Sequence, residues 1–153
     1  MLTFAGRKSA VLMAGVLAAI GSVCWAQPLP PPGECPQPRF TGKAPEEYYN
    51  LKNPLEASEK NLKAAERLYV GGKKTVGCAM CHGKKGDGKG ELASQFVPRP
   101  RNFACAQTVR DIPDGQLYWI IRFGSPGTSM PAHEDLGDEQ LWQLVLYLRT
   151  LAK

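Results

Sequence analysis

Apolar residues recur at helical spacing in three segments of this 153-residue chain, over residues 53–70, about 114–124 and 138–151. Each segment begins at a residue suited to a helix start and ends at or near a glycine or at the chain end. No stretch alternates apolar and polar residues for long enough to predict a strand. The pattern therefore predicts a small all-α domain.

The first and last helices carry the clearest start signals. Asn53 is a good N-cap, Pro54 suits the first helical position, and Glu56 falls where a capping box places its acid. The last helix has acidic residues in its first turn, which suits the helix dipole. Its apolar stripe consists of Leu141, Leu144, Val145, Leu148 and Leu151.

Residues 1–26 predict a secretory signal peptide. A short basic start precedes an apolar run over residues 10–23, which is too short for a comfortable membrane span, and small residues follow at the predicted cleavage site. An uncleaved anchor and lipidation of Cys24 are the alternatives, although residues 21–23 match a lipoprotein box poorly. We therefore expect a periplasmic protein with no stable membrane insertion once the signal is removed.

Residues 27–52 predict an N-terminal arm, and residues 53–153 predict one small domain. The stretch 27–38 contains six prolines and a single charged residue, Glu34, which favours extended polyproline geometry. The formal net charge is +5, and removal of the signal leaves 17 basic and 14 acidic residues. Such a small imbalance gives no support for a nucleic-acid partner.

The run Gly77-Cys78-Ala79-Met80-Cys81-His82-Gly83 carries the clearest chemistry, because C-x-x-C-H is the signature of covalent c-type haem attachment. On a helix, Cys78 and Cys81 lie on one face, so that their sulfurs can reach the two vinyl groups of one porphyrin. His82 can then direct a ring nitrogen at the iron. The motif predicts one covalent haem c with His82 as an axial ligand.

Met130 is the candidate for the second axial ligand. It lies on a loop rich in glycine and proline, 48 residues after His82, whereas Met1 and Met13 fall in the predicted signal and Met80 should point away from the haem. A thioether ligand raises the reduction potential. His133 stays open as an alternative ligand or as a titrating group near the haem edge.

With these motifs in place, residues 55–151 resemble the class I (monohaem) cytochromes c. The resemblance implies a small cytochrome c fold in which the first and last helices cross beside the covalently bound haem. Ala65 and Tyr69 on the first helix, with Leu144 and Tyr147 on the last, fall where that crossing requires them.

Two later landmarks agree with this resemblance, and one departs from it. The run Pro-Arg-Asn-Phe at 100–103 and the pair Met130-Pro131 match the family pattern. Glu91 stands where the family commonly has a proline whose carbonyl accepts the proton of the proximal histidine. We therefore expect the carbonyl of residue 91 or of Pro98 to orient His82.

The resemblance implies an electron-transfer protein and not an enzyme: a periplasmic single-electron carrier, ligated by His82 and Met130, that passes electrons between larger redox proteins. Two alternatives stay open, a haem subunit tethered to a periplasmic dehydrogenase or oxidase, and a ligand-binding haem sensor with an open sixth position. Basic residues around the attachment motif indicate partners that are acidic at the docking site. They are Lys73, Lys74, Lys84, Lys85, Lys89, Arg99 and Arg101.

Cys35 and Cys105 form the remaining even pair of cysteines. In an oxidising compartment we expect a disulfide between them, closing a ring of about 70 residues, with two separate buried thiols as the alternative.

Overall fold

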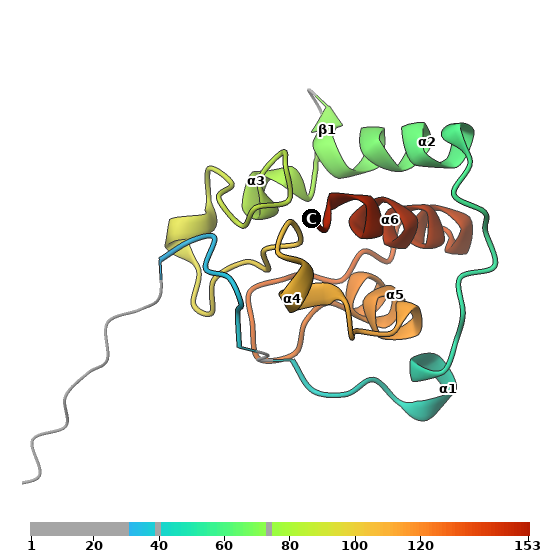
Figure 1. The fold of residues 1–153 in the computed structure, drawn as a ribbon, viewed down its shortest axis with the longest axis horizontal. Coiled ribbons are helices and arrows are strands. Elements are labelled where there is room, and N and C mark those ends of the chain that lie inside the picture. The colour runs from blue at the N-terminus through green and yellow to red at the C-terminus, as the bar shows by residue number, and fades with distance from the viewer. Residues whose placement is uncertain (1–30, 39–40, 73–74) are drawn as a thin grey trace, which may run out of the picture.

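The computed structural model describes residues 31–38, 41–72 and 75–153. The predicted signal peptide, and Lys73 and Lys74 of the predicted basic patch, lie outside these residues. Within the described part, helices dominate, so the all-α prediction is confirmed (Figure 1). The helices are α1 (Glu46–Tyr49), α2 (Glu59–Val70), α3 (Ala79–His82), α4 (Ala106–Val109), α5 (Asp114–Phe123) and α6 (Asp138–Leu151), with a 3-10 turn at Ala93–Gln95.

Two short strands, which the sequence did not predict, connect α2 to α3. Strand β1 (Gly71–Gly72) pairs antiparallel with β2 (Thr75–Val76), and Gly71 lies opposite Val76. Strands of two residues are too short to show an alternating pattern. The hairpin leads the chain from α2 directly into the Cys78–His82 motif.

The predicted start of the first helix at Asn53 is wrong, because helix α2 begins at Glu59. Ser58 is its N-cap, and the Ser58 hydroxyl accepts a hydrogen bond from the Asn61 N–H at 3.3 Å. The Asn53 side chain instead accepts from the Leu55 N–H at 3.0 Å and donates to the Trp142 carbonyl at 2.9 Å. Asn53 thus closes a local turn and ties this segment to α6.

Helix α6 lies between α2 and α5 and contacts both (Figure 1). Ala65 and Tyr69 of α2 are fully buried, and Leu144 and Val145 of α6 are almost fully buried. The rings of Tyr69 and Tyr147 lie 5.2 Å apart. The expected contact between the first and last long helices is therefore present, and the small side chain of Ala65 permits a close approach. In the described part of the chain, none of the helices is both long and apolar enough to cross a bilayer.

Helix α5 begins at Asp114, and Pro113 occupies its cap position. The Asp114 carboxylate accepts two hydrogen bonds from Arg149 of α6, at 2.9 and 2.7 Å. The Arg149 guanidinium also donates to the carbonyl of Val109, at 2.8 Å, and to that of Ile112. Arg149 therefore joins the last turn of α6 to the end of α4 and the start of α5.

The described part of the predicted arm is bound along the domain. The Tyr48 ring lies 6.4 Å from that of Tyr118 on α5. Gln116 of α5 is fully buried; its side chain accepts from the Ala44 N–H at 2.7 Å and donates to the Gly42 carbonyl at 3.2 Å. A Cβ at position 115 would lie 1.9 Å from the Tyr48 carbonyl oxygen, so the glycine there permits the close approach of α1.

Candidate haem site

All four predicted site residues line one cavity. Cys78, Cys81 and His82 line it from the α3 segment, and Met130 lines it from the loop that follows α5. Side chains of α2, α5 and α6 complete much of the wall, and most of them are apolar. They include Tyr69, Leu117, Ile120, Ile121, Leu144 and Leu148.

His82 is buried and is held in a defined tautomer. Its Nδ1 lies 2.9 Å from the Arg101 carbonyl oxygen, which can only accept, so Nδ1 carries the proton. Burial lowers the pKa of His82 to about 4, despite the opposing effect of the hydrogen bond to Arg101. The ring is therefore neutral near pH 7, and Nε2 carries the lone pair that binds a metal.

The expectation that the carbonyl of residue 91 or Pro98 orients His82 is wrong, because the carbonyl of Arg101 has this role. The chain bends at residues 97 and 98, and the carbonyl that meets His82 lies three residues beyond Pro98. The Phe103 ring lies 4.7 Å from the imidazole and packs against it. Sequence pattern alone does not reveal which carbonyl of an irregular segment faces a given side chain.

Cys78 and Cys81 are free thiols. Burial raises the pKa of Cys78 to about 11 and also raises that of Cys81, so both are protonated at neutral pH. Their backbone is tightly enclosed, since a Cβ on Gly90 would lie 2.3 Å from the Met80 carbonyl oxygen. The chain therefore presents the two sulfurs from a short, closely packed helix and from the N-cap residue that precedes it.

Local hydrogen bonds shape the loop that bears Met130. The Met130 N–H donates to the Thr128 hydroxyl and the Ser125 N–H donates to the Met130 carbonyl, each at 3.2 Å. His133 lines the same cavity, whereas Met80 is not among the lining residues. The structure thus brings both candidates, Met130 and His133, to the site.

Sequence reasoning missed that the N-terminal arm forms part of the cavity wall. Gln37, Pro38 and Thr41 line the cavity, yet they lie in a segment with no hydrophobic period. The predicted disulfide was the one available signal, and the structure confirms it, with the Cα atoms of Cys35 and Cys105 5.7 Å apart. This bond fastens the arm beside the cavity.

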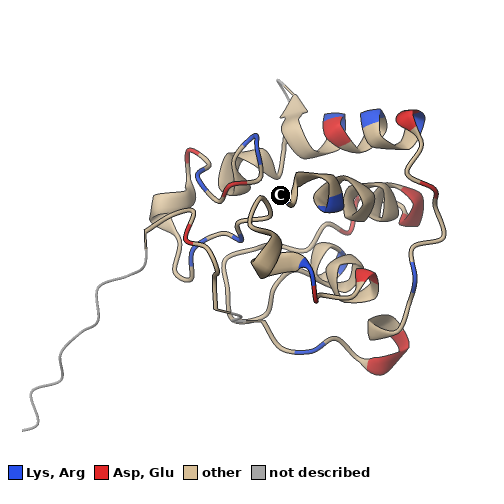
Figure 2. Cartoon of the chain, viewed as in Figure 1, with Lys and Arg blue, Asp and Glu red and all other residues tan. Residues whose placement is uncertain are grey.

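Two members of the predicted basic patch have structural bonds. Arg99 donates to the carbonyls of Ala93 and Phe96, at 3.3 and 3.4 Å. Arg101 donates to those of Gln37 and Pro38, at 3.3 and 3.2 Å. Acidic residues gather at α1 and at the start of α6, away from the lysines of the loop after α3 (Figure 2).

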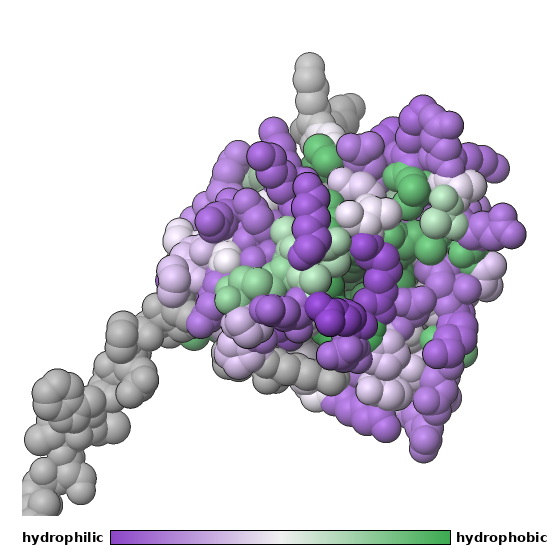
Figure 3. All heavy atoms as spheres, in the orientation of Figure 1, coloured by the Kyte–Doolittle hydropathy of each residue, from purple (hydrophilic) through white to green (hydrophobic). Residues whose placement is uncertain are grey.

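The face shown in Figure 3 is largely hydrophilic, with apolar surface exposed between the polar side chains. Among the apolar side chains of the described residues, Val76 is 80% exposed and Val97 is 58% exposed, and Val76 lines the cavity. Apolar surface therefore reaches solvent at the edge of the cavity.

The donor set fits a covalently attached haem. Among the residues that the structure describes, no group of three or more His, Cys, Asp and Glu side chains could hold a bare metal ion. The cavity instead offers two neutral thiols, the His82 imidazole with an available Nε2, the Met130 thioether and the His133 imidazole within a mainly apolar wall. Such a set suits a planar apolar group that brings its own iron.

Comparison with known proteins agrees with this chemistry. A family model described as Cytochrome c matches residues 62–152. The chain belongs to the cytochrome c family. Membership of this family implies covalent haem c, electron transfer and redox partners. A search of curated proteins gave no match.

This cytochrome c is also similar to a chain in the solved structure of the Kuenenia stuttgartiensis reducing HAO-like protein complex Kustc0457/Kustc0458. The two share 26% sequence identity with a TM-score of 0.56, and the match covers 69% of this chain and 49% of that chain. The match thus spans about half the length of that relative.

Proposed function

We propose that this cytochrome c is a periplasmic single-electron carrier with one haem, attached through Cys78 and Cys81 and ligated by His82 and Met130. The observation that carries the proposal is the convergence of these four side chains on one mainly apolar cavity, with the His82 proton on Nδ1. When bound there, the haem supplies a reversible one-electron change at its iron.

The residues of the chain have distinct tasks around that group. The Arg101 carbonyl orients His82 and increases the basicity of its ring. The apolar side chains of α5 and α6 exclude water and lower the local dielectric constant, which favours the less charged ferrous state. Met130, as a neutral thioether, favours the same state. The Lys84 and Lys85 ammonium groups would attract an acidic partner toward this end of the molecule.

Visible spectra test the proposed ligand pair. We expect the ferric haem-loaded protein to show a sulfur-to-iron charge-transfer band, and the ferrous form to bind no carbon monoxide. Met130→Ala should abolish the band and admit carbon monoxide, whereas His133→Ala should leave both properties unchanged. Absence of the band from the unsubstituted ferric protein, or carbon monoxide binding by the unsubstituted ferrous protein, would contradict the proposal.

The proposed export depends on the predicted signal peptide at residues 1–26, and the mass of the mature protein tests this prediction. Cleavage after Ala26 gives a chain that begins at Gln27. An intact mass that includes residues 1–26, or a mass shifted by a lipid on Cys24, would contradict this part of the proposal.

A second candidate function is that of a haem subunit within a larger oxidoreductase complex. It is favoured by the similarity to a chain that is part of a complex and is about twice as long as the matched region. Native mass spectrometry of the protein from its source would separate the two candidates. A monomeric mass supports the free carrier, and a stoichiometric complex supports the subunit.

A further inference from the structure

The N-terminal arm forms hydrogen bonds on both sides of Arg101, the residue whose carbonyl orients His82. The Gln37 side chain bonds on both sides of Arg101: its Nε2 donates to the Pro100 carbonyl at 3.0 Å, and its Oε1 accepts from the Asn102 N–H at 2.6 Å. One amide group thus brackets the residue that accepts the His82 proton. Neither of these bonds is local, since 63 and 65 residues separate the partners.

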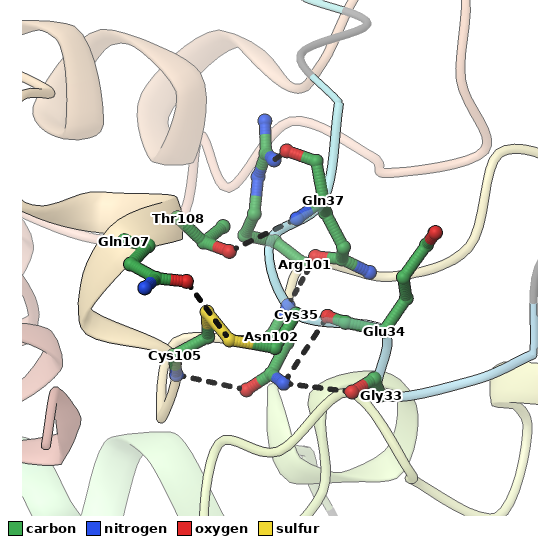
Figure 4. The surroundings of a disulfide bond; sticks show 9 residues. All are labelled: Gly33, Glu34, Cys35, Gln37, Arg101, Asn102, Cys105, Gln107 and Thr108. Carbon is green, nitrogen blue, oxygen red and sulfur yellow. Dashed lines mark hydrogen bonds between the residues drawn. A yellow bond between two sulfur atoms is a disulfide. The ribbon is translucent and has the colours of Figure 1, made fainter.

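A disulfide and several hydrogen bonds hold the Gln37 side chain beside Arg101 (Figure 4). The disulfide from Cys35 to Cys105 fastens the two segments close to Gln37. The buried Asn102 side chain donates to the Gly33 carbonyl at 2.9 Å and accepts from the Cys105 N–H at 3.1 Å. Asn102 therefore links the arm to the turn that bears Cys105.

The backbone of Gln37 forms further hydrogen bonds to the same segment. The Gln37 N–H donates to the Thr108 hydroxyl at 3.2 Å, and the Arg101 guanidinium donates to the Gln37 carbonyl at 3.3 Å. Gln37 therefore uses its backbone N–H, its carbonyl and both side-chain polar atoms on the segment 100–108. Such a fully bonded residue restricts the movement of the peptide that it contacts.

We propose that Gln37 is a positioning residue for the haem: it fixes the Arg101 carbonyl against Nδ1 of His82 and thereby sets the reduction potential. The inference rests on the proposed function, in which His82 ligates the iron. A short, fixed Nδ1–H bond makes the imidazole a stronger donor and stabilises ferric iron, so a loosened acceptor raises the potential. Gln37 lies outside residues 62–152, so this device belongs to the arm and not to the family domain.

Gln37→Met tests the inference in the full haem-loaded protein, because methionine keeps the length of the side chain and removes both polar atoms. The matched control is Gln143→Met, which removes a buried amide that bonds Asn61 and Glu139 and is not among the residues lining the cavity. Two quantities are measured: the midpoint potential, and the solvent exchange rate of the His82 Nδ1 proton in the ferrous form by NMR.

We expect Gln37→Met to raise the potential and to accelerate the exchange at least severalfold, with neither change in Gln143→Met. The expected change in the ferric-to-ferrous stability ratio is less than tenfold, which bounds the shift at about 59 mV. An unchanged exchange rate overturns the inference, even where the potential moves, because Gln37 also lines the cavity and could act on the haem directly.

The same NMR spectra distinguish failure of this inference from failure of the proposed function. The His82 ring protons must show the large upfield shift of an axial ligand in the unsubstituted protein; its absence overturns both. Where Gln37→Met yields no haem protein, Gln37→Leu removes the same two polar atoms with a shorter side chain. It should move both readouts in the same directions, and unchanged values overturn the inference.

Discussion

Replacement of Arg149 by methionine should destabilise the fold much more than the loss of an ordinary surface ion pair. The guanidinium makes two hydrogen bonds to Asp114 and one each to the Val109 and Ile112 carbonyls. The Arg149 and Asp114 side chains are only 31% and 28% exposed. Methionine keeps the aliphatic stem but leaves one carboxylate and two carbonyls without these donors.

The magnitude follows from this intermediate burial. Breaking a fully buried pair costs about 3–5 kcal/mol, whereas exposed pairs contribute about 0–1 kcal/mol. Water can reach part of the vacated site at roughly one-third exposure, so we expect Arg149→Met to lower the free energy of unfolding by about 2–3 kcal/mol.

Guanidinium chloride unfolding of the haem-loaded protein, followed by far-UV circular dichroism, measures this loss. The matched control is Arg122→Met. Arg122 pairs with Asp138 where the two side chains are 38% and 72% exposed, and its loss should cost no more than about 1 kcal/mol. Equal destabilisation of the two variants, or a loss below about 1 kcal/mol for Arg149→Met, would refute the reasoning.

Three further changes test other features of the fold. The disulfide closes a ring with a sequence separation of 70. C35A/C105A should therefore lower the free energy of unfolding by about 2–4 kcal/mol in denaturant titrations. A loss below about 1 kcal/mol would show that the arm is held mainly by its other contacts. Gly90→Ala places a Cβ 2.3 Å from the Met80 carbonyl oxygen in the attachment motif. We expect this variant to lose about 1–3 kcal/mol of unfolding free energy in the same assay. Gly42→Ala is the control and should be neutral, because nothing lies within 4 Å of the added Cβ. A hydrogen bond from the Tyr118 hydroxyl, and a smaller contribution from the Arg122 guanidinium, lower the pKa of Asp138 below its ordinary value of 3.8. The resulting stability is present above pH 3.8 and is lost as the pH falls below it, so the acid unfolding curve of Asp138→Asn should lack this component.

Sequence reasoning predicted best the features that local patterns encode. The last helix, 138–151, agrees with the structure at both ends, because a continuous apolar stripe and an acidic first turn define it. The attachment motif is contiguous, so its location needs no tertiary information. Membership of the cytochrome c family, inferred from this motif and the later landmarks, is confirmed.

The errors concern polar groups whose partners are distant in the chain. Asn53 resembles an N-cap locally, yet its amide bonds to the Trp142 carbonyl, 89 positions away. Likewise, the carbonyl that orients His82 belongs to Arg101, and the arm that holds it has no amphipathic pattern. Local propensity cannot predict such bonds, because they exist only after the segments have met.

Under the proposed function, the positions of the described cysteines constrain the order of maturation. Cys35 and Cys105 flank the attachment motif in sequence, so the ring that they close contains Cys78 and Cys81. Four thiols can pair in three ways, and two of those pairings bond an arm or turn cysteine to a haem-attachment cysteine. Such pairings would leave neither sulfur of the motif available to a vinyl group. In an oxidising compartment, haem attachment as proposed would therefore depend on the two inner thiols being kept from, or released from, bonds to the outer pair.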